Sequence, residues 1–123
     1  MARLTHHEWF ARVAGLKERL NAEPDSLDLA RQFWAALGDT ASFDLRTGQR
    51  AIDAFQSCAM KTSEGLGELV SVIRSLADEI GEYPRPELFD PPLENLLRHT
   101  ARQPDNPISG DAAWILGHID SEP

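Results

Sequence analysis

Four histidines and one cysteine are the side chains in this sequence best suited to catalysis or metal binding. His6 and His7 are adjacent, so on a helix they would point about 100° apart, whereas a two-ligand metal face needs a spacing of four residues. His99 and His118 fall in the last turns of two expected helices, where a protonated imidazole is favourable. The spacing therefore predicts structural or surface roles for the histidines and no bound metal or cofactor.

Cys58 is the only cysteine, so no intrachain disulfide can form. An activated thiol needs a helix N-terminus or a cationic neighbour, but Cys58 lies near the C-terminal end of an expected helix. It follows Phe55 by three residues, which favours a place in the core. We expect a buried, inert thiol, and the low cysteine count favours a reducing cytoplasm.

Carboxylates gather in the second half of the chain. Acid–base catalysis needs two of them at a fixed separation with their pKa values pushed apart, and nothing in the spacing singles out a pair. The first interpretation of this cluster is a solvated acidic surface, and the alternative is a surface that binds a partner. The cluster comprises Asp78, Glu79, Glu82, Glu87, Asp90 and Glu94.

The connector at residues 81–92, GEYPRPELFDPP, contains four of the eight prolines. Proline fixes φ, removes a backbone donor and favours extended geometry in the residue before it. We therefore expect a stiff, extended segment between two helices, with Arg85 paired to Glu82 or Glu87. One role for this segment is to turn the chain and cover the core; the other is to bind a partner. The candidate partner-binding residues are Glu82, Tyr83, Arg85, Glu87, Leu88, Phe89, Asp90 and Glu94.

The net charge of −8, from 12 bases and 20 acids, disfavours several classes of ligand. Nucleic-acid binding needs bases to neutralise phosphates, and an anionic membrane surface attracts bases too. Residues 1–61 hold eight bases and eight acids, whereas residues 62–123 hold four bases and twelve acids, so the second half carries the whole excess. No apolar run approaches 18 residues and the N-terminus lacks a signal-peptide core. We expect a soluble, cytoplasmic chain.

The first half of the sequence predicts three helices. Thr5 and Glu8 form a capping box, before a helix with Trp9, Val13, Leu16 and Leu20 on one face. A second helix, capped by Asp25 or Ser26, runs through Leu37 and ends at Gly38 in a left-handed conformation. Adjacent Phe33 and Trp34 cannot both point to the centre of one core, so one of them should lie at its flank or be exposed. The first interpretation is a wide buried face on this helix, and the alternative is a contact with a partner helix or a second copy. Phe43 and Leu45 should be apolar side chains that anchor a loop or short turn. Thr47 should cap a third helix at Gly48–Met60.

The second half predicts three more helices. Thr62 or Ser63 caps a central helix in which Leu66, Leu69, Ile73, Leu76 and Ile80 repeat at helical spacing, and Gly81 ends it. Gly65 and Gly67 in its first turn should admit another backbone closely. Asp90 caps the next helix with Pro91 at its first position. A short last helix spans about Asp111–Ile119, and the tail at residues 120–123 should be frayed.

These patterns together predict an all-α compact bundle of five to six helices, with one extended proline-rich connector, in a single domain of residues 1–123. Small acidic helical bundles are common among bacterial binding proteins such as immunity proteins, antitoxins and inhibitors, which is an analogy of fold class only. The leading hypothesis is a non-enzymatic module, monomeric or weakly dimeric, that binds a basic patch on a larger protein. The alternatives are a nucleic-acid-mimicking inhibitor and a small enzyme with a His, Cys58 and carboxylate site.

Overall fold

The computed structural model describes residues 5–40 and 44–120. Within these residues the chain forms six α-helices and no β-strand, which confirms the predicted all-α bundle. No helix there is both long enough and apolar enough to cross a bilayer. The helices are α1 His6–Ala22, α2 Leu27–Ala36, α3 Leu45–Ser57, α4 Ser63–Ile80, α5 Pro91–Ala101 and α6 Ser109–Asp120.

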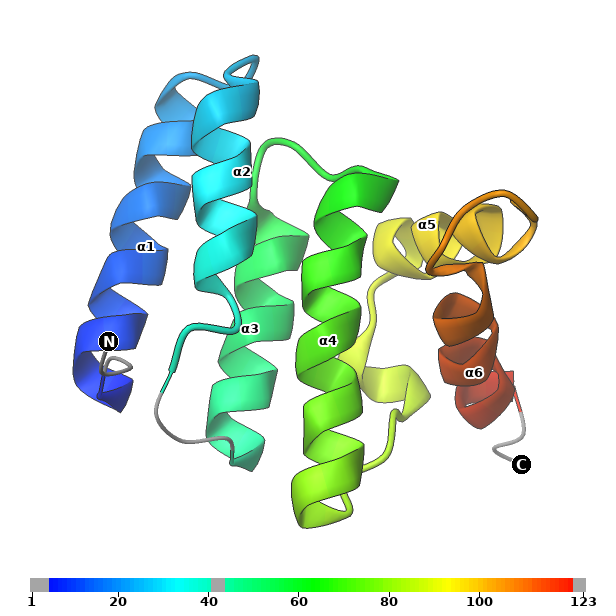
Figure 1. The fold of residues 1–123 in the computed structure, drawn as a ribbon. Coiled ribbons are helices and arrows are strands. Elements are labelled where there is room, and N and C mark those ends of the chain that lie inside the picture. The colour runs from blue at the N-terminus through cyan, green and yellow to red at the C-terminus, as the bar shows by residue number, and fades with distance from the viewer. Residues whose placement is uncertain (1–4, 41–43, 121–123) are drawn as a thin grey trace.

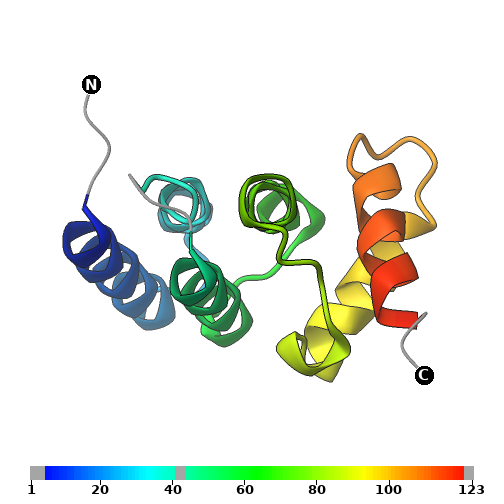
Figure 2. The same cartoon turned by 90° about the horizontal axis from the view of Figure 1, so that it is seen from below.

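The helices pack as three consecutive pairs, α1–α2, α3–α4 and α5–α6, of which the first two are antiparallel (Figure 1). Figure 1 shows α1 to α4 side by side, and Figure 2 shows that α1 and α3 form one row while α2 and α4 form the other. Contacts run between α1 and α3 within the first row and between α2 and α4 within the second. The α5–α6 pair lies at the end of the stack next to α4, with α5 running across the direction of the first four helices.

One hydrophobic cluster joins all six helices and the connector. It includes Trp9, Phe33, Trp34, Phe55 and Phe89, each at most 8% exposed. The periodic stripe of α4 is buried as predicted except at its last member, Ile80, which is 42% exposed because it lies in the final turn. The core therefore holds the connector against the bundle rather than leaving it as a free strap.

Helix termini that have local capping residues lie where the sequence predicts them. Thr5 and Glu8 form the capping box of α1, and Thr62 caps α4. Gly81 ends α4 with φ of 71°, the left-handed conformation that glycine adopts without strain. Asp90 accepts a hydrogen bond from the Leu93 amide and so caps α5. The last two of these ends, at Gly81 and Asp90, fix where the connector leaves α4 and where it enters α5.

The third helix was predicted wrongly at both ends. It begins at Leu45 rather than Gly48, because the Asp44 carboxylate accepts a hydrogen bond from the Thr47 amide and caps the helix three residues earlier. It ends at Ser57, since Cys58 has an extended backbone with ψ of 156°. Leu45 is thus a helical residue rather than an apolar anchor of a loop. Phe43 lies outside the described residues.

The left-handed end predicted at Gly38 is also wrong, since Gly81 is the only described residue with positive φ. The indole Nε1–H of Trp9 instead donates to the carbonyls of Ala36 and Leu37, at 2.8 and 3.2 Å. Those carbonyls belong to the end of α2, where backbone acceptors lack helical partners. A side chain from α1 thus satisfies the helix end that we expected a glycine to close.

Phe33 and Trp34 are both buried, which agrees with the wide buried face and not with an exposed contact face. Both can be buried because α2 packs against α1 and against α4. Trp34 lies over Gly65 in the first turn of α4, where an added Cβ would overlap the indole ring. The glycine therefore admits an aromatic ring rather than a second backbone.

Two differences remain at the C-terminal end. The last helix is longer than predicted, because it extends from Ser109 to Asp120. Asp120 was expected in a frayed tail but pairs with Arg98 of α5 at 2.8 Å. The rest of that predicted tail, residues 121–123, lies outside the described residues.

Candidate functional site

The connector is anchored at both of its ends by backbone hydrogen bonds. After Gly81, the Glu82 amide donates back to the Leu76 carbonyl of α4 at 3.1 Å. At the other end, the Asp90 amide donates to Oε1 of Gln56 on α3 at 2.6 Å. The path between α4 and α5 is therefore fixed against α3.

The connector is extended only in part. Residues Pro86–Leu88 form a single 3-10 turn, η1, in which the Leu88 amide donates to the Arg85 carbonyl at 3.1 Å. Proline at the first position of this turn costs no hydrogen bond, because that amide would have no partner in the turn. Glu87 is exposed on the turn, whereas Phe89 beyond it is 8% exposed and belongs to the core.

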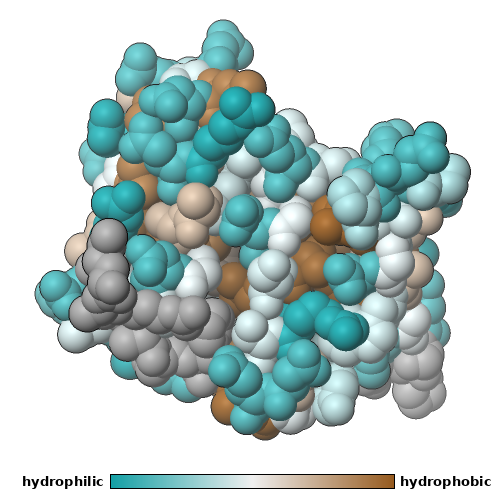
Figure 3. Space-filling view, viewed as in Figure 1, coloured by the Kyte–Doolittle hydropathy of each residue, from teal (hydrophilic) through white to brown (hydrophobic). Residues whose placement is uncertain are grey.

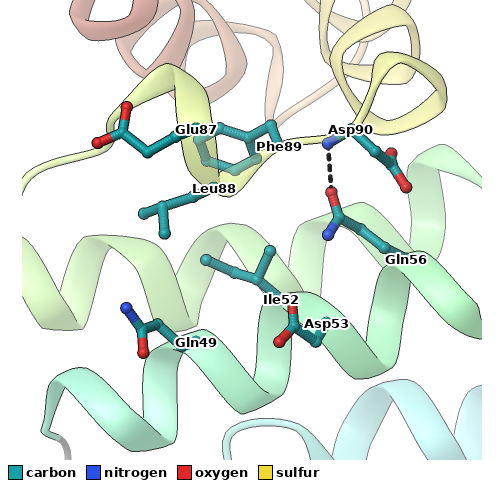
Figure 4. A pocket seen from close by; sticks show the side chains of 8 residues that line it. All are labelled: Gln49, Ile52, Asp53, Gln56, Glu87, Leu88, Phe89 and Asp90. Carbon is teal, nitrogen blue, oxygen red and sulfur yellow. Dashed lines mark hydrogen bonds between the residues drawn. The ribbon is translucent and has the colours of Figure 1, made fainter.

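A pocket of about 350 Å³ lies between α3 and the connector. Ile52 and Leu88 face each other across it (Figure 4). Three acidic residues, Asp53, Glu87 and Asp90, also line it from separate parts of the chain, although the carboxylates of Glu87 and Asp90 point in different directions (Figure 4). The full lining is Gln49, Ile52, Asp53, Gln56, Glu87, Leu88, Phe89 and Asp90.

The pocket has an excess of negative charge. Arg85 Nε is 3.6 Å from Glu87 Oε1, which confirms one of the two pairings expected for that arginine. The Asp90 carboxylate accepts the capping bond from the Leu93 amide at 2.9 Å. Among residues 5–40 and 44–120, no basic side chain forms an ion pair with Asp53 or Asp90. Three carboxylates with one paired cation favour a positively charged ligand.

The eight candidate partner-binding residues are divided among three places. Glu87, Leu88, Phe89 and Asp90 line the pocket between α3 and the connector. Glu82, Tyr83 and Arg85 line a much smaller crevice on the other side of Leu88. Glu94 lines neither the pocket nor the crevice. Its carboxylate pairs with Arg98 at 2.6 Å, and Arg98 also pairs with Asp120. These contacts raise the pKa of Arg98 and lower that of Asp120.

Tyr83 is 53% exposed and belongs to an aromatic cluster that the sequence did not reveal. Its ring stacks on His118 at 5.2 Å, and His118 meets Trp114 edge-on at 4.8 Å. Arg74 of α4 lies 4.3 Å from the centre of the Trp114 ring. These contacts link the connector, α4 and α6 beside a hydrophobic strip that reaches the surface between α4 and α6 (Figure 3). Trp114 and His118 are four residues apart on α6, which was the available signal.

The arrangement does not supply an activated thiol. Cys58 is 2% exposed, and burial raises the pKa of its thiol despite the nearby Lys61. Three of the four histidines have separate local contacts: His6 with Thr47, His99 with Gln103, and His118 with Tyr83. Among the described residues, no three His, Cys, Asp or Glu side chains are placed to share a metal ion.

Comparison with known proteins does not add to this description. The chain matches no protein-family model, no curated protein and no solved structure. Its function must therefore be argued from the pocket, the connector and the surrounding charges.

Proposed function

We propose that this chain is a non-enzymatic protein-binding module that takes an arginine or lysine side chain of a protein partner in the pocket between α3 and the connector. The observation that carries the proposal is the composition of that pocket. Ile52, Leu88 and Phe89 offer an apolar wall for the aliphatic stem of such a side chain. Carboxylates at the same pocket suit its charged head, through charge-assisted hydrogen bonds.

The pocket is also pre-organised, which supports a binding role. Its connector wall is held by the Gln56–Asp90 bond, by the capped start of α5 and by the burial of Phe89. Binding then requires little ordering of the protein, and ordering is a major cost of association. The second-half excess of acid would further raise the rate of encounter with a basic partner.

Nucleic-acid mimicry would require a continuous row of uncompensated carboxylates. Several second-half carboxylates are instead neutralised by arginines, which interrupts such a row. The pairs are Glu64 with Arg31, Asp111 with Arg74, and Glu94 and Asp120 with Arg98. We therefore favour a pocket for one basic side chain over an extended phosphate-like surface.

The proposal can be tested by titrating the labelled protein with two blocked tripeptides, Gly-Arg-Gly and Gly-Glu-Gly, at low salt. Only the arginine peptide should shift the backbone amide resonances of residues 49–56 and 87–90. The double variant D53N/E87Q should reduce these shifts, whereas E68Q on the exposed surface of α4 should not. Equal shifts with both peptides, or shifts unaffected by D53N/E87Q, would refute the proposal.

A further inference from the structure

A second depression, of about 200 Å³, lies between α1 and α3. Its apolar wall is formed by Phe10, Val13 and Ala14 of α1 and by Ala54 of α3. Phe10 is 38% exposed, one of the few large apolar side chains that the fold leaves accessible. Lys17 and Arg50 also line this depression, from α1 and α3 respectively. It is called the α1–α3 groove below.

The two cations of the α1–α3 groove lack carboxylate partners within the described part of the chain. Lys17 Nζ donates to Ser57 Oγ at 3.0 Å. The Arg50 guanidinium lies 4.1 Å from the centre of the Phe10 ring. Asp53 also lines the groove, so two cations face one carboxylate there, and this excess of positive charge favours a negatively charged ligand.

Arg50 is held in place by a neutral group rather than by an acid. Its Nη1 donates to His6 Nε2 at 3.1 Å, and His6 Nδ1 lies 3.1 Å from Thr47 Oγ1. A guanidinium only donates, so Nε2 accepts and the proton of the imidazole lies on Nδ1. Burial, followed by the charges of Arg46 and Arg50, lowers the pKa of His6 and keeps this ring neutral. The charge of Arg50 is thus positioned without being compensated.

The groove and the acidic pocket lie on adjacent faces of α3, one on each side of Asp53, which lines both. Gln49, Ile52 and Gln56 face the pocket, whereas Arg50, Ala54 and Ser57 face the groove. The width of a helix is about 10 Å with its side chains, and an extended chain covers that distance in about three residues. An extended segment that crosses α3 at Asp53 therefore reaches both depressions.

We infer that the α1–α3 groove is a second subsite for the same partner segment, and that it takes an apolar residue next to a carboxylate. The inference rests on the proposed function of the pocket and specifies the partner. The partner would present an extended segment with an arginine or lysine and, about three residues away, an apolar residue followed by an acid. Charge of opposite sign on the two sides of α3 sets the direction in which the segment binds.

The test uses three blocked peptides: Arg-Gly-Gly-Leu-Glu, Arg-Gly-Gly-Leu-Gln and Gln-Gly-Gly-Leu-Glu. Dissociation constants are measured by resonance titration at low salt. The first peptide should bind about fivefold more tightly than the second, the scale of one exposed ion pair. K17M, which keeps the aliphatic stem, should remove that difference, while the matched R19M on the exposed part of α1 should keep it.

Failure of the groove and failure of the pocket give different results. If the first two peptides bind the wild-type protein equally, or K17M weakens both alike, the groove subsite is refuted. If Gln-Gly-Gly-Leu-Glu binds as tightly as the first peptide and still depends on Lys17, the groove stands and the basic-side-chain pocket fails. A salt-sensitive dimer in sedimentation that K17M abolishes would assign the groove to a second copy of the chain and overturn a separate partner.

Discussion

The contact between Trp34 and Gly65 gives the sharpest test of the packing that positions α3, α4 and the connector. Replacement of Gly65 by alanine would put a Cβ against the indole ring, 2.6 Å from both Cδ2 and Nε1. The ring cannot move aside easily, because Trp34 is 1% exposed and its Nε1–H donates to the Met60 carbonyl at 3.3 Å. The same replacement at Gly15, in the exposed middle of α1, would meet no atom within 4 Å.

The two substitutions should therefore have opposite effects. Overpacking of a core costs about 1–3 kcal/mol, which outweighs the gain in helix propensity in the first turn of α4. Gly15→Ala keeps only that gain, about 0.5–1 kcal/mol. With an unfolding entropy of about 2.1 cal/mol/K per residue, a chain of 123 residues changes its Tm by about 4 °C per kcal/mol. We expect Gly65→Ala to lower Tm by about 4–12 °C and Gly15→Ala to raise it by about 2–4 °C.

Thermal unfolding followed by far-UV circular dichroism measures both shifts under one condition. Gly65→Ala should also change the near-UV signal of the buried indole, which Gly15→Ala should leave unchanged. If Gly65→Ala raised Tm as much as Gly15→Ala, the close packing of Trp34 on α4 would be wrong. The arrangement of α2 against α4 would then need revision.

Three further predictions concern single groups. The pKa of His6 is lowered on folding, so the unfolded chain binds more protons below about pH 6.5. The free energy of unfolding should therefore decrease as the pH is lowered through that window. Urea titrations should show a smaller decrease in H6Q. Cys58 is buried with a raised pKa, so a disulfide reagent should label it far more slowly in the native protein than in denaturant; equal rates would contradict its placement. Gly81 has φ of 71°, so Gly81→Ala should cost about 1 kcal/mol in urea unfolding and Gly81→Asn less; equal costs would mean that the left-handed conformation is not the cause.

Local signals in the sequence were sufficient where a helix end is closed by its own side chains. Thr5, Thr62 and Asp90 each cap the helix that follows them, and Gly81 closes α4. These features depend on neighbours within about four residues, so no knowledge of the fold is needed to predict them. The same reasoning failed at Gly38, because the end of α2 is satisfied by an indole that comes from α1.

The burial of adjacent aromatics could not be decided from the sequence. Phe33 and Trp34 diverge by about 100° around α2, and both are buried because helices lie on more than one side of it. Tyr83, Trp114 and His118 were likewise treated separately, although the fold brings their rings together. Contacts between residues more than 30 positions apart depend on the path of the connector, which propensities and periodicity do not specify.

The sequence singled out one wall of the pocket as a partner-binding segment but did not predict a pocket. The connector was singled out for its prolines, acids and apolar residues, and Glu87, Leu88, Phe89 and Asp90 do line a common cavity. The opposite wall, formed by Gln49, Ile52, Asp53 and Gln56 of α3, was not predicted. On the sequence these residues read as an ordinary amphipathic helix, and only the packing of the connector on α3 makes them part of a pocket.

The distribution of charge in space differs from its distribution along the chain, and this difference supports a binding role. The sequence divides into a neutral half and an acidic half, which by itself is consistent with solubility alone. In the fold, Asp53 from the neutral half joins Glu87 and Asp90, while Lys17 and Arg50 lie across α3 in the groove. Solubility requires net charge but no particular arrangement of the charged side chains on the surface. Charges of opposite sign on two faces of α3, each beside apolar walls, are instead suited to a partner segment that carries the complementary pattern.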